Sequence, residues 1–88
     1  MNFFDGALVE HQGTQFGVIV VSPGVPQNPA QSAAWFNLAL QIWGPIPLAL
    51  MTQDARGVPT YYSDDSNLVQ FLSTLPLESI PWQRWTVS

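Results

Sequence analysis

The sequence predicts a small α+β domain: an antiparallel sheet of two β-hairpins, two helices and a possible C-terminal strand, in the order β-β-α-β-β-α-β. Its 88 residues are enough for one domain, 1–88, and too few for two. Prolines and glycines divide the chain into segments whose apolar residues recur with either strand or helix periodicity. Short turns join successive strand-like segments in two places, which indicates antiparallel pairing.

The first hairpin is predicted from residues 3–11 and 14–21, joined by Gln12-Gly13. Gly13 can adopt the positive φ that a tight hairpin turn needs. The first segment alternates between two faces over most of its length, as a strand does. The second segment contains an uninterrupted run of β-branched residues. Such a run predicts a central strand that is covered on both faces.

The first helix is predicted over residues 29–43. Asn28 is a favourable N-cap, and Pro29 suits the first helical position because its missing N–H has no helical partner there. Gly44 can adopt the positive φ that ends a helix, and Pro45 prevents its continuation.

A second hairpin is predicted from residues 46–53 and 58–62 around the turn 54–57. Pro59 cannot donate a backbone hydrogen bond, so its strand is expected at an edge of the sheet. Of the two tyrosines in this strand, Tyr61 and Tyr62, one is expected in the core and one at the surface, because neighbouring strand residues face opposite sides.

A second helix is predicted over residues 67–75, capped by the segment 63–66. Residues 76–81 then form a turn or a short helical piece, and residues 82–88 form the possible last strand. The simplest arrangement places both helices on one face of the sheet. The β-branched run of the first hairpin implies that the other face is also protected, at least in part.

Composition restricts the partners that the protein can have. Cysteine is absent, which excludes disulfides, thiolate metal sites and cysteine nucleophiles. The sequence contains no lysine and only two arginines, Arg56 and Arg84, and its net charge is −4. This balance opposes binding to nucleic-acid phosphates and to anionic membranes. With no basic leader at residues 1–6 and no membrane-length apolar segment, we expect a cytoplasmic protein without nucleic-acid or membrane partners.

The sequence contains no recognisable catalytic constellation. Glu10 and His11 are neighbours, but on a strand they face opposite sides, and His11 is interpreted as a solvated turn residue. The pair Asp64-Asp65 is interpreted as part of a helix cap rather than as paired catalytic carboxylates. A metal site is not expected either, because one histidine and scattered carboxylates lack ligand spacing. We therefore expect neither an enzyme nor a cofactor.

The first predicted helix is apolar on nearly every side. From Ala33 onward its only polar residues are Asn37 and Gln41, which are four positions apart and form one polar line. One sheet face can cover one apolar stripe of this helix but hardly the neighbouring stripe as well. Two interpretations remain open: a wide contact within the domain, or an interface with another subunit or partner.

These features favour a non-catalytic interaction, assembly or accessory protein that works as a homo-oligomer, most simply a homodimer, or with another protein. Few charges, the apolar helix and four tryptophans support this hypothesis, because tryptophan and tyrosine are enriched in binding hot spots. Segment 82–87 is also a candidate for strand pairing between subunits. The candidate interface residues are Phe36, Leu40, Trp43, Tyr61, Tyr62, Trp82 and Trp85.

The alternative hypothesis is a small-molecule binding domain. Its pocket is expected to combine aromatic side chains with Arg56, whose guanidinium can orient an acidic ligand. The aromatic residues proposed for this pocket are Trp35, Tyr61, Tyr62 and Trp82.

Overall fold

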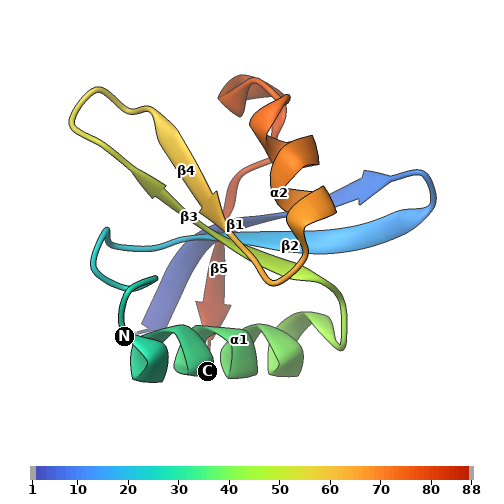
Figure 1. Cartoon of the computed structure of the whole chain (residues 1–88). Coiled ribbons are helices and arrows are strands. Elements are labelled where there is room, and N and C mark those ends of the chain that lie inside the picture. Colours follow the sequence, from blue (N-terminus) through green and yellow to red (C-terminus); the bar gives the residue numbers. More distant parts are fainter. Residues whose placement is uncertain (1, 88) are drawn as a thin grey trace.

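A computed structural model describes residues 2–87 and confirms the α+β class (Figure 1). A five-stranded sheet carries two helices and one short 3₁₀ turn. In chain order, the elements are β1 (Asn2–His11), β2 (Thr14–Val20), α1 (Pro29–Trp43), β3 (Leu48–Gln53), β4 (Pro59–Tyr62), α2 (Ser66–Ser73), the 3₁₀ turn (Leu77–Ser79) and β5 (Gln83–Val87).

The sheet has the strand order β4-β3-β2-β1-β5. Both predicted hairpins form, and β5 pairs antiparallel with β1, so the C-terminal strand is present. One pairing differs from the expected antiparallel arrangement, because β2 and β3 run parallel and make the sheet mixed. The physical reason is the crossover connection through α1. It carries the chain from the end of β2 back to the edge of the sheet where β2 begins, so that β3 runs in the same direction as β2.

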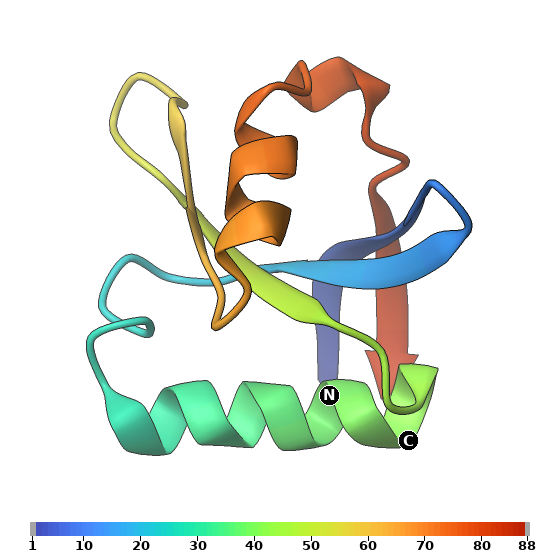
Figure 2. The ribbon, with the colours of Figure 1, turned by 45° about the vertical axis from the view of Figure 1, so that its right-hand side comes forward.

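The two helices lie on opposite faces of the sheet, not on one face (Figures 1 and 2). The central strands are apolar on both sides, as the β-branched run predicted. Ile19 and Leu50 pack in the cluster on the α1 side, whereas Val18, Ala49 and Met51 pack in the cluster on the α2 side. Each face therefore needs its own helix to exclude water.

The bounds of α1 agree with the sequence prediction at both ends. The Asn28 side-chain oxygen accepts hydrogen bonds from the backbone N–H groups of Ala30 and Gln31, each at 3.1 Å. At the other end, Gly44 has a φ of 81°, and its N–H donates to the carbonyl of Leu40 at 3.0 Å. Both ends of this uncharged helix are thus held by local contacts.

Removing the cap should weaken α1 measurably. We expect Asn28→Ala to lower the free energy of unfolding by about 0.5–2 kcal/mol, because two helical N–H groups lose their acceptor. Asn28→Asp is the matched control, since its carboxylate can accept the same bonds, and should stay close to the wild type. Urea unfolding followed by tryptophan fluorescence measures both variants. Equal stability of Asn28→Ala and wild type would contradict the cap.

The acidic residues near the turns also serve local structure. Asp65 caps α2, its Oδ1 accepting from the N–H groups of Asn67 and Leu68 at 3.0 and 3.3 Å. Asp54 accepts from the backbone N–H groups of Arg56 and Val58 at 2.8 and 2.9 Å. The carboxylate of Asp54 therefore shapes the β3–β4 turn through backbone donors.

Candidate interaction surface

Helix α1 is only partly buried by the rest of the chain. Among its 15 residues only Ala39 is fully buried, and Leu40 is 52% exposed. One side of α1 therefore packs on the sheet, whereas another side faces outward. The large apolar residues that are half-buried against the core are Trp35, Phe36, Leu38, Ile42 and Trp43.

The inward side of α1 joins an aromatic cluster around Phe4, a residue that is 3% exposed. The ring of Phe4 lies 5.9 Å from Trp35, 5.6 Å from Trp43 and 6.5 Å from Trp85, measured between centroids. Trp43 and Trp85 also meet edge to face at 5.3 Å. Two of the candidate interface residues, Trp43 and Trp85, therefore contribute mainly to the core.

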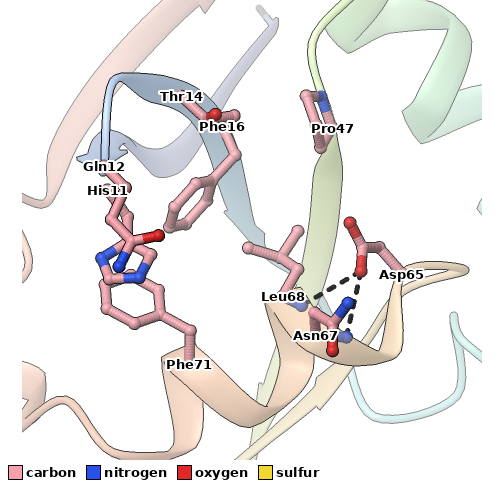
Figure 3. A pocket seen from close by; sticks show the side chains of 9 residues that line it. All are labelled: His11, Gln12, Thr14, Phe16, Pro47, Asp65, Asn67, Leu68 and Phe71. Carbon is pink, nitrogen blue, oxygen red and sulfur yellow. Dashed lines mark hydrogen bonds between the residues drawn. The ribbon is translucent and has the colours of Figure 1, made fainter.

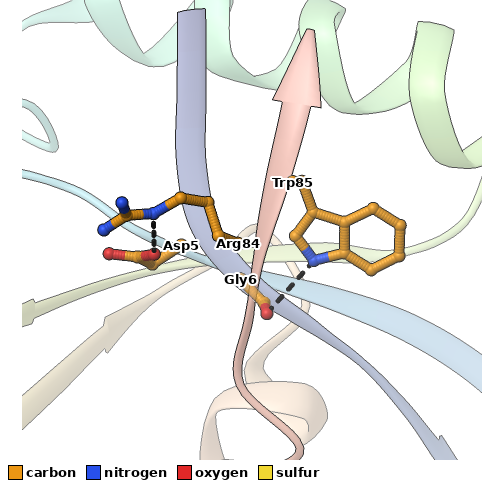
Figure 4. Close-up of polar contacts among 4 residues, drawn as sticks. All are labelled: Asp5, Gly6, Arg84 and Trp85. Atoms are coloured by element: carbon orange, nitrogen blue, oxygen red, sulfur yellow. Dashed lines mark hydrogen bonds and ion pairs between the residues drawn. The ribbon is translucent and has the colours of Figure 1, made fainter.

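Trp85 reaches this cluster because β5 lies beside β1. Its indole N–H donates to the carbonyl of Gly6 at 3.2 Å (Figure 4). On the opposite side of the two strands, Arg84 lies 3.4 Å from Asp5 and stacks on Phe3, with its guanidinium carbon 4.2 Å from the ring centroid. These pairs join residues about 80 positions apart, so no local pattern in the sequence could have revealed them.

The outward flank of α1 borders an open groove, named here the α1 groove. It consists of two adjoining hollows of about 490 and 340 Å³, which share Phe36, Ser63 and Asp64 in their walls. Tyr61 and Tyr62 line the first hollow, and Leu40 with Ile46 lines the second. Four candidate interface residues, Phe36, Leu40, Tyr61 and Tyr62, are thus brought to one groove.

One of the two tyrosines lies in the core, as predicted, but the other is only partly exposed and not a surface residue. Tyr61 is 7% exposed, whereas Tyr62 is half-buried against the α1-side cluster. The hydroxyl of Tyr61 is buried and has no hydrogen-bond partner among the described residues. Burial raises the pKa of the Tyr61 phenol above its usual value, because the ionised form loses its hydration.

The aromatic pocket of the alternative hypothesis is not assembled in this fold. Trp35 packs on the α1 side of the sheet, whereas Trp82 packs on the α2 side and donates its indole N–H to the carbonyl of Leu77 at 3.1 Å. Arg56 is exposed in the β3–β4 turn and lines none of the hollows that contain Tyr61 or Tyr62.

His11 is exposed, as a turn histidine should be, but it also has a partner. Its ring stacks on that of Phe71 from α2, with centroids 3.8 Å apart and planes inclined by 22°.

Within residues 2–87 no three potential metal-binding side chains gather in one place. Nor does any described helix have the length and apolar character needed to cross a membrane.

Known proteins supply no further guide to this surface. Comparisons with protein families, curated proteins and solved structures found no match.

Proposed function

We propose that the protein is a non-catalytic interaction protein that self-associates through the outward flank of α1. The exposure of Leu40 carries this proposal, because a leucine that is 52% exposed lies on a helix without a single charged residue. A helix that faced only water would normally present charged or polar side chains there. The neighbouring α1 groove offers the apolar side chains of Phe36 and Ile46, against which a partner's Leu40 could pack, and Asp64 and Asp65 line the same hollow.

The energetics favour an interface of several residues. Complete burial of a leucine or phenylalanine side chain gains about 1.5–3 kcal/mol, whereas association costs on the order of 4–15 kcal/mol in lost translational and rotational freedom. Leu40 alone is therefore insufficient. Phe36, Ile46 and Tyr62, which border the same groove, supply the additional area.

A twofold pair of α1 helices fits these residues. In such a pair the same surface serves both subunits, so Leu40 of each chain packs beside Phe36 of the other. The helix is about 22 Å long at 1.5 Å per residue. Its exposed residues Ala33 and Ala34 are small, which permits a close approach, and no helix charge has to be dehydrated.

Leu40→Glu should convert the protein into a folded monomer. The exposed position tolerates a carboxylate in the single chain, whereas burial of that charge in a dimer is costly. Sedimentation equilibrium over 5–500 μM should show a concentration-dependent mass for the wild type and a constant monomer mass for the variant. Gln31→Glu is the matched control, because it adds the same charge to an exposed site at the other end of α1.

The control should dimerise as the wild type does, and all three proteins should show the same circular dichroism spectrum. A wild-type chain that remains monomeric at 500 μM would refute self-association.

A further inference from the structure

A second pocket lies on the opposite face of the sheet from α1, between the tip of the first hairpin and the start of α2 (Figure 3). Its volume is about 230 Å³. Phe16, which is 3% exposed, and Leu68, which is 7% exposed, form its apolar interior. The pocket is smaller than the roughly 300 Å³ at which drug-sized sites begin, so it suits a fragment-sized molecule.

One wall of this pocket is aromatic. His11 lies flat on Phe71, and Phe71 meets Phe16 edge to face with ring centroids 5.7 Å apart. The stack holds the hairpin tip against α2, although His11 itself is exposed. Aromatic rings arranged in this way offer a flat apolar surface and an electron-rich face, which favour a planar ligand and a nearby cation.

The opposite wall is acidic. Asp65 lines the pocket, and the two described hydrogen bonds to its side chain both end on Oδ1. Figure 3 shows its other carboxylate oxygen directed away from the two capped N–H groups. No arginine or lysine lines the pocket. An ammonium group can therefore reach a carboxylate oxygen here, whereas an anion placed at the same point would be repelled by the Asp65 charge.

We propose that this pocket binds a small arylalkylamine, with its aryl group in the apolar interior beside Phe16 and Phe71 and its ammonium group at Asp65. The size of the pocket, its aromatic wall and its single carboxylate define this ligand class. Leu40 and Phe36 do not line this pocket, but Pro47 and Asp65 also line the second hollow of the α1 groove, so the pocket and the groove adjoin at the start of α2.

Titration with 2-phenylethylamine tests the proposal directly. Two-dimensional ¹H–¹⁵N NMR spectra should show saturable shifts at Thr14, Asn67 and Phe71, with a dissociation constant of about 1 mM, as expected for a ligand of this size. The neutral analogue 2-phenylethanol should bind at least about tenfold more weakly, because a neutral hydrogen bond replaces the charge-assisted one. The anion 3-phenylpropanoate should not bind measurably, because its carboxylate is repelled by Asp65.

A matched pair of variants tests the carboxylate. Asp65→Asn keeps an N-cap acceptor while removing the charge, and should weaken amine binding about tenfold with an unchanged melting temperature. Asp54→Asn makes the same chemical change at a site that also accepts backbone N–H groups but lies outside the pocket, and should bind as the wild type does.

Two results would overturn the proposal. The first is the absence of saturable shifts in the wild type at 20 mM amine. The second is equal affinity for the amine and the alcohol, which would show that Asp65 does not select the charge. The analogue series uses only the wild-type chain, so the test holds even if Asp65→Asn folds poorly.

Discussion

Replacing Phe4 by alanine should lower the free energy of unfolding by about 3–5 kcal/mol. Phe4 is 3% exposed and touches Trp35, Trp43 and Trp85. Its removal leaves a cavity among three large rings that cannot close without moving α1 or β5. A chain of 88 residues has a small margin of stability, so the variant should be largely unfolded at 37 °C.

The adjacent residue provides the control. Phe3 faces the other side of β1, is 40% exposed and contacts Arg84. Phe3→Ala should lose the cation–π contact, worth about 0.5–1 kcal/mol at an exposed site, and little more. Urea unfolding of both variants, followed by far-ultraviolet circular dichroism, separates the two positions. If Phe3→Ala and Phe4→Ala lowered the free energy of unfolding by similar amounts, the aromatic cluster around Phe4 would not be what stabilises the α1 side of the sheet.

The second large effect is expected at Gly17, in the middle of β2. A Cβ atom built on Gly17 would clash with the ring of Trp43 and would come within 3.2 Å of Leu48. Because Trp43 also packs against Phe4 and Trp85, its ring cannot move freely. Gly17→Ala should therefore cost about 1–3 kcal/mol through overpacking, and Gly17→Val should prevent folding.

Gly24 offers the comparison, since a Cβ atom there meets nothing within 4 Å. Gly24→Ala should leave stability unchanged or raise it by about 0.4–1 kcal/mol. The double variant Gly17→Ala/Trp43→Leu should be more stable than the sum of its single changes predicts, because the smaller side chain makes room for the new methyl group. If the two free-energy changes were strictly additive, the destabilisation caused by Gly17→Ala would not come from its contact with Trp43.

The sequence was informative where structure depends on near neighbours. Helix α1 begins at Pro29 and ends at Trp43, as predicted, because its cap bonds reach no further than four residues. The Gln12-Gly13 turn was equally predictable, and both residues adopt positive φ, at 52° and 80°. Pro59 placed its strand at an edge, since a residue without an N–H is excluded from a central strand.

The candidate surfaces were predicted only in part. The sequence singled out Leu40 and Phe36 from the excess of apolar residues in α1, and the structure places them beside one groove. It also suggested Trp43 and Trp85, but hydrophobicity cannot separate a residue in the core from one at an interface. The pocket beside Asp65 was missed, because His11 and Phe71 are 60 positions apart and come together only when the hairpin tip meets α2.

By itself, the amino-acid sequence determined the elements of this protein: their type, most of their bounds, their order and the apolar character of α1. Only the tertiary structure decided that β2 and β3 run parallel and that α1 and α2 cover opposite faces. It also decided that β5 forms the edge strand beside β1. The physical reason is the distance along the chain over which each kind of interaction acts. Caps and turns depend on bonds between residues a few positions apart, whereas strand neighbours and pocket walls are selected by the joint burial of side chains from the whole chain.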